Sequence, residues 1–93
     1  MKESIWNKSK KIEGRDSERW RYDAAGNPVL KAATFRADYA LEYDHIIAFK
    51  KGGRSTEDNC QILHWEANCL KAAKVMELSE LKLEHLLNKE LMD

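Results

Sequence analysis

The apolar and polar positions of the first third of the chain predict a short helix followed by a β-hairpin. Residues 2–13 hold the apolar contacts of a helix, and Gly14 ends it. Polar and aromatic residues alternate over residues 19–22, which is typical of a strand. Residues 23–28 combine aspartate, glycine, asparagine and proline, and this composition favours a turn. We therefore expect a β-hairpin over residues 20–31.

The middle of the chain has the pattern of two strands and a helix. The predicted segments are a strand over residues 41–47, a loop over 50–58, a strand over 60–63 and a helix from residue 65. In the first of these strands the alternation places Leu41 and Tyr43 on one face, and Glu42 and Asp44 on the other. Together with the hairpin, this order predicts a single domain of the α+β class.

The carboxyl-terminal segment, residues 75–93, is predicted to be an amphipathic helix. No glycine or proline follows Arg54, and Ser79 is a suitable cap for a helix over residues 79–92. Leucines recur at the spacing i, i+4, i+8, and further leucines widen this apolar stripe. They are Leu83, Leu87 and Leu91, with Leu78, Leu81 and Leu86 beside them. This stripe either covers the domain's own core or docks a second copy or another protein, and we expect the docking role.

Composition and charge bound the class of protein. The chain has 93 residues and a net charge of zero, which argues against a protein that coats nucleic acid non-specifically. Residues 1–36 nevertheless carry nine Lys or Arg against five Asp or Glu, so this leader is basic.

No stretch approaches the ~18 apolar residues of a membrane span, so no membrane association is expected. The start lacks the apolar core of a secretory signal, and two cysteines are too few for a disulfide scaffold. We expect an intracellular protein in a reducing compartment, such as the cytoplasm, the nucleus or an organelle matrix.

Four polar residues in the middle of the chain are candidates for a catalytic site. Asp44 and His45 are adjacent near the end of a strand, so their side chains point to opposite faces. If the following helix packs across the two strands, Asp44 and Asn68 can offer oxygen atoms to one hard cation such as Mg²⁺. His45 beside that cation can accept a proton from water, and Asn59 can orient the loop or the imidazole through its amide.

These residues, with others in fixed order around them, resemble the HNH family of metal-dependent nucleases. The matching positions are Glu42 to Ile47, Lys51 to Gly53, Thr56 to Asn59, Gln61 to Leu63, and Asn68 with Lys71. Upstream segments resemble the leader of a small-protein subgroup of this family, so the resemblance covers roughly residues 5–74. It implies a ββα-metal core over residues 41–74, with the hairpin before it and helices at both ends.

The resemblance also implies the roles of the site residues. Asp44 and Asn68 would bind one divalent cation, Mg²⁺ or Mn²⁺. His45 would be the general base that activates water against a phosphodiester of nucleic acid, with DNA as the expected partner, and Asn59 would hold the loop in place. The expected contacts to nucleic acid are Lys50, Lys51, Arg54, Lys71 and Lys74.

Some positions depart from the family's pattern. Cys69 and Leu70 stand where polar or basic residues are usual, and Tyr43 stands where an aliphatic residue is usual. The alternative function is therefore a catalytically inactive, HNH-derived subunit of a larger protein or nucleoprotein assembly. A zinc site built from Cys60, His64 and Cys69 is a weaker alternative, because the three residues are irregularly spaced.

Overall fold

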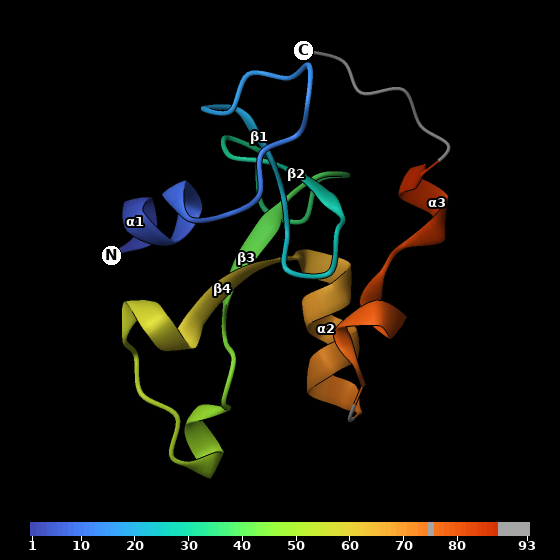
Figure 1. Cartoon of the computed structure of the whole chain (residues 1–93). Helices are drawn as coiled ribbons and strands as arrows, with labels where there is room; N and C mark the ends of the chain where they lie inside the picture. The colour runs from blue at the N-terminus through green and yellow to red at the C-terminus, as the bar shows by residue number, and fades with distance from the viewer. Residues whose placement is uncertain (75, 88–93) are drawn as a thin grey trace.

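The computed structural model describes residues 1–74 and 76–87, and it contains two small antiparallel sheets with helices around them (Figure 1). The α-helices and strands in chain order are α1 (Lys2–Asn7), β1 (Trp20–Tyr22), β2 (Pro28–Leu30), β3 (Leu41–His45), β4 (Cys60–His64), α2 (Trp65–Ala73) and α3 (Glu84–Leu87). Single 3₁₀ turns lie at Phe49–Lys51, Glu57–Asn59 and Leu78–Leu81. The predicted α+β class is confirmed. No helix among the described residues is long and apolar enough to cross a membrane.

Strands β3 and β4 pair in antiparallel fashion and are followed directly by α2, which gives the order strand, strand, helix. The register runs from Leu41 opposite His64 to His45 opposite Cys60, with the loop of residues 46–59 at the far end. In Figure 1 this loop extends away from the rest of the molecule. The predicted strands in this region are confirmed, although the first ends at His45 rather than at residue 47.

The two faces of the β3–β4 pair are covered by different elements. On one face Cys60 and Ile62 are buried against α1 and β2, and Leu41 and Tyr43 pack on the same cluster. On the other face Leu63 is fully buried in a second cluster that includes α2 and the carboxyl-terminal segment. Alternation along the strands therefore assigns Glu42 and Asp44 to the α2 face, as the sequence predicted.

The first hairpin forms as predicted, but the helix before it is shorter than expected. Trp20 pairs with Leu30, and Tyr22 with Pro28. Helix α1 ends at Asn7 rather than at residue 13, and Lys11 instead forms an isolated β-bridge with Arg21.

The buried guanidinium of Arg21 explains the early end of α1. It donates to the carbonyl groups of Trp6, Asn7 and Ser9 at 3.1, 3.1 and 2.8 Å. The last carbonyls of a helix lack partners within the helix. Here a side chain from β1 supplies those partners, so the chain can turn into an extended path after residue 7.

The prediction of one amphipathic helix over residues 79–92 is wrong for its described part. A 3₁₀ turn at Leu78–Leu81 is followed by the short helix α3, and residues 88–93, including Leu91, lie outside the described residues. Leu81, Leu83 and Leu86 are buried inside this chain, against Leu63 and α2. These three leucines are thus core residues and need no partner. The expected docking role is not supported for them.

The side chain of Asn27 accounts for the break in that segment. Its Nδ2 donates to the carbonyl of Leu81 at 2.9 Å, and its Oδ1 accepts from the backbone N–H of Leu83 at 2.7 Å. Asn27 is fully buried in the turn of the first hairpin. The carbonyl of Leu81 and the N–H of Leu83 therefore bond to a distant turn instead of forming helical hydrogen bonds.

Candidate active site

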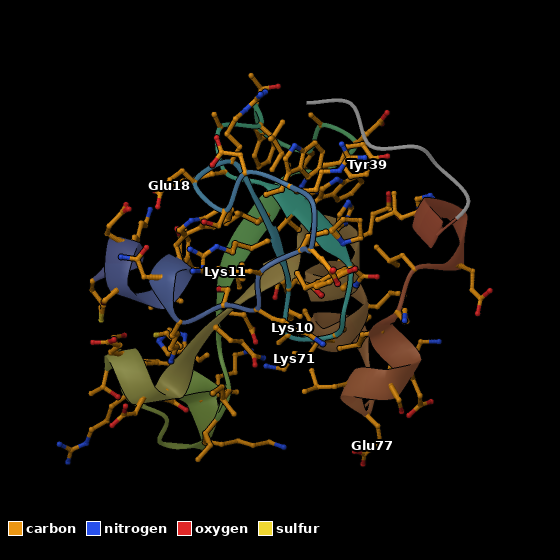
Figure 2. The ribbon with its side chains drawn as sticks, turned by 45° about the horizontal axis from the view of Figure 1, so that its top comes forward. Lys10, Lys11, Glu18, Tyr39, Lys71 and Glu77 are labelled. Atoms are coloured by element: carbon orange, nitrogen blue, oxygen red, sulfur yellow. The ribbon has the colours of Figure 1, made fainter. Side chains whose placement is uncertain are left out.

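The face of α2 that packs on β3 carries Asn68 and Lys71, one turn apart. Asn68 Nδ2 donates to Oε1 of Glu42 at 3.0 Å, and Lys71 Nζ donates to Oδ2 of Asp44 at 2.5 Å. Figure 2 labels Lys71, whose side chain extends from α2 toward the β3–β4 pair. The predicted packing of the helix across the two strands therefore places Asn68 and Asp44 in the same interface, each bonded to a different neighbour.

Asp44 is the most enclosed charged group of this interface. Its side chain is 14% exposed, and Oδ2 accepts a second hydrogen bond from Nε2 of Gln61 at 3.0 Å. Gln61 lies directly opposite Asp44 on β4. Two donors on one oxygen fix the direction of the carboxylate.

The donor set of this interface has the chemistry that a hard cation requires. Asp44 and Glu42 supply carboxylate oxygens, and Asn68 supplies an amide oxygen. Among the described residues, no group of three or more His, Cys, Asp or Glu side chains is arranged to hold a metal ion. A cation here would depend on few protein ligands and on water. Mg²⁺ is commonly bound in this way, through one or two carboxylates and several waters.

His45 ends β3 on the face opposite to Asp44, as the alternation predicted. Its Nε2 lies 2.8 Å from Oγ of Ser55, within hydrogen-bond distance, and its ring centroid lies 6.3 Å from that of Phe49. The carbonyl of His45 accepts from Nζ of Lys71 at 2.6 Å. Ser55 of the loop thus contacts the imidazole of His45, and Lys71 of α2 bonds to the backbone of the same residue.

Asn59 closes the loop of residues 46–59 at its base. Its Oδ1 accepts from the N–H of Ile47 at 2.8 Å, and its Nδ2 donates to the carbonyls of Ile47 and Arg54 at 3.1 and 2.8 Å. The backbone carbonyl of Asn59 also accepts from the N–H of Ile46. The residues that immediately follow His45 are therefore fixed by this one asparagine, which is the arrangement expected of a residue that holds the loop.

The predicted nucleic-acid contacts divide into two groups. Lys50, Lys51, Arg54 and Lys74 are exposed, and the first three lie on the loop beside His45. Lys71 differs, because its ammonium is engaged by Asp44 and by the carbonyl of His45. Its direct contact with phosphate stays a prediction, and the structure gives it a different position, inside the candidate site.

Three residues of the site were not singled out as site residues from the sequence. Glu42 could have been found, since it lies two residues before Asp44 on the same face of the strand. Gln61 and Ser55 depend on the strand register and on the course of the loop, which spacing alone does not give.

The zinc alternative has no support among the described residues. Cys60 is buried and Cys69 is exposed. His64 is fully buried; its Nε2 lies 2.6 Å from the carbonyl of Asp38, and its Nδ1 accepts from the N–H of Glu66 at the start of α2. This histidine is a helix cap and a packing residue.

A comparison with protein families agrees with this geometry. Residues 30–74, which include β3, β4 and α2, match the family model described as HNH endonuclease. No curated protein and no solved structure matches the chain.

Proposed function

We propose that this chain, which belongs to the HNH endonuclease family through residues 30–74, hydrolyses DNA phosphodiester bonds with the help of one divalent cation, Mg²⁺ or Mn²⁺. The family indicates nuclease-type cleavage of nucleic acid in general. The choice of DNA, the cation and the residue roles are our proposal.

The observation that carries the proposal is the junction of Asp44 and His45 at the end of β3. The carboxylate faces α2 and its oxygen-bearing side chains, and the imidazole faces outward beside the loop. A cation and a general base are then held by adjacent residues of one strand. Lys71 holds the backbone carbonyl of His45, and Asn59 holds the backbone of Ile47, two residues later.

His45 would act on the water that attacks phosphorus. As the new bond from the water oxygen to phosphorus forms, the imidazole takes the proton, and the bond to the leaving oxygen breaks. Histidine suits this role because its charge changes near neutral pH. Ser55 would hold the ring through its hydroxyl.

Asp44 and Asn68 would hold the cation, with Glu42 beside them. When bound there, a divalent cation supplies positive charge against the charge that builds on the phosphate oxygens. The exposed cations Lys50, Lys51 and Arg54 would contact the phosphates on either side of the cleaved bond.

The test is cleavage of plasmid DNA by wild-type chain and by His45→Ala, with Mg²⁺ or Mn²⁺ and with a chelator. We expect cleavage to require the cation, and His45→Ala to lower the rate by about 10²–10⁴-fold. His85→Ala is the matched control, because His85 is exposed and contacts Glu66 at the start of α2 rather than a residue of the candidate site. Cleavage that survives in His45→Ala would remove the proposed base.

The inactive-subunit alternative is favoured by one observation, the ammonium of Lys71 against Asp44. This side chain already neutralises the carboxylate that would bind the cation. A wild-type chain that folds but cleaves no DNA or RNA with either cation would support this alternative.

A further inference from the structure

Three large apolar side chains are exposed directly after the candidate base. Ile46, Ile47 and Phe49 are 49%, 57% and 74% exposed. The other large apolar residues with this exposure among those described are scattered, at Met1, Phe35 and Leu78. Scattered apolar residues on a surface are ordinary, but three of them within four consecutive residues beside a site are typical of a binding surface.

Cationic side chains follow this group in the same loop, and we call the group the Phe49 surface (Ile46, Ile47 and Phe49). Lys50 and Lys51 follow Phe49 in the same 3₁₀ turn, and Arg54 lies in the same loop. No ion pair joins these three cations to an acidic side chain within the described residues. The loop also carries acidic side chains in its second turn, at Glu57 and Asp58. An apolar surface next to these cations fits a partner that has both apolar faces and an anionic backbone. Nucleic acid is such a partner, because its bases offer the apolar faces and its phosphates the negative charge.

The position of the phenyl ring limits which part of the nucleic acid it can meet. Its centroid lies 6.3 Å from that of the His45 imidazole, with the two ring planes at 57°. If His45 acts at a phosphate, the groups within reach of Phe49 are those of the adjoining nucleotides. In a closed duplex the faces of these bases are covered by their neighbours. An unpaired base offers a free face to an aromatic ring.

We propose that Phe49 stacks on an unpaired base next to the cleaved phosphate, and that the chain therefore prefers single-stranded or locally opened DNA to closed duplex. This inference rests on the proposed function, and it adds the structure of the substrate. Lys50, Lys51 and Arg54 supply the electrostatic part of binding, which by itself favours the duplex, because its charge density is higher. The contact of the base with Phe49 supplies the preference for the unpaired form.

The test measures binding rather than cleavage. Fluorescence anisotropy, in the presence of a chelator, gives the dissociation constants for one labelled DNA sequence as a single strand, as a blunt duplex and as a forked duplex. The proteins are the wild-type chain, Phe49→Ala, Phe49→Trp and Phe35→Ala. Phe35 is the matched control, because it is 83% exposed and lies outside the loop. Thermal melts confirm that each variant is folded.

We expect the wild-type chain to bind the single strand and the fork more tightly than the duplex. Phe49→Ala should weaken binding to these two ligands by about 5- to 100-fold, in line with the loss of one base–aromatic stack, and should change duplex binding little. Phe49→Trp should retain the preference, and Phe35→Ala should bind all three ligands within about twofold of wild type.

Three results would overturn the inference. The first is a dissociation constant for the single strand that Phe49→Ala leaves unchanged, while wild type still binds and cleaves DNA; the proposed function would then stand without this contact. The second is an equal loss on all three ligands. The third is unchanged DNA binding with a lower solution mass of Phe49→Ala, which would make the Phe49 surface a protein contact. A wild-type chain that binds no DNA would overturn the proposed function as well.

Discussion

The ammonium of Lys71 lies 2.5 Å from Oδ2 of Asp44, so a cationic side chain of α2 occupies the carboxylate at the end of β3. The same ammonium donates to the carbonyl of His45 at 2.6 Å. Lys71 thus joins the helix to both residues of the candidate site. It stabilises the junction of strand and helix, and it also competes with any cation that binds to Asp44.

Replacing Lys71 by methionine separates these two effects. Methionine keeps most of the apolar length of the side chain and removes the charge. We expect Mg²⁺ and Mn²⁺ to bind roughly tenfold more tightly to Lys71→Met, since a nearby positive charge is lost. In the absence of cation the free energy of unfolding should fall by about 1–2 kcal/mol, because both side chains are mostly buried. Isothermal titration and urea unfolding measure the two quantities.

Lys74→Met is the control for this change. Lys74 lies at the end of the same helix and is exposed, so its replacement should alter neither cation affinity nor stability appreciably. If Lys71→Met binds the cation no better than Lys74→Met does, the cation site does not include Asp44.

The two adjacent glycines of the loop should respond differently to alanine. A Cβ at Gly53 would lie 1.7 Å from the carbonyl oxygen of Ile47 and 2.9 Å from Nδ2 of Asn59, so the base of the loop would have to open. A Cβ at Gly52 meets nothing within 4 Å, but the φ of +88° strains any other residue. We expect Gly53→Ala to cost about 3 kcal/mol of stability and Gly52→Ala about 1–2 kcal/mol.

Urea unfolding of the two variants tests this order. Nuclease activity should follow it, because the segment that Gly53 contacts begins two residues after His45. A Gly53→Ala chain as stable as Gly52→Ala would show that the close approach of backbone at Gly53 is not needed for the fold.

Local patterns were sufficient to predict the elements that position the site. Alternation over residues 41–47 assigned Glu42 and Asp44 to one face, and the structure shows that this face meets α2. The lack of a helix breaker after residue 65 predicted α2. These features are governed by neighbouring residues, so the sequence alone contains them.

Long-range hydrogen bonds account for what the patterns missed. Arg21 on β1 ends α1 by a hydrogen bond to Asn7, fourteen residues earlier in the chain. Asn27 interrupts the expected carboxyl-terminal helix by a hydrogen bond to Leu83, fifty-six residues later. Each is a single buried polar side chain that satisfies backbone groups of a distant segment. The spacing of apolar and polar residues along the sequence gives no information about such contacts. For the same reason, the sequence predicted a contact of Lys71 with phosphate and did not show that its ammonium bonds to Asp44 and to the carbonyl of His45.

Asn27 should be among the most sensitive polar positions in the chain. Truncation to alanine leaves the buried carbonyl of Leu81 and the N–H of Leu83 without their partner. We expect a loss of about 2–4 kcal/mol in the free energy of unfolding. The exposed Asn7 is the control, and Asn7→Ala should change stability by less than about 0.5 kcal/mol.

Hydrogen exchange locates the effect of Asn27→Ala. The amide of Leu83 should exchange faster relative to amides of β4, because it has lost its acceptor while the β3–β4 pairing remains. Equal protection of the Leu83 amide in the variant and in wild type would mean that Asn27 does not hold the carboxyl-terminal segment.

Tyr43 should make the fold sensitive to alkaline pH. Burial raises the pKa of its phenol above the usual 10.0; Lys31 nearby lowers it in part, and Glu3 raises it. The folded chain therefore holds the phenolic proton more tightly than the unfolded chain does. This contribution to stability is fully present below pH 10 and is lost as the pH rises through the raised pKa. The free energy of unfolding of wild type should thus fall more steeply above pH 10 than that of Tyr43→Phe, which has no phenol to ionise. Urea unfolding of both proteins at neutral pH and at a series of alkaline pH values measures the two slopes, and parallel slopes would show that Tyr43 ionises equally in the folded and unfolded chains.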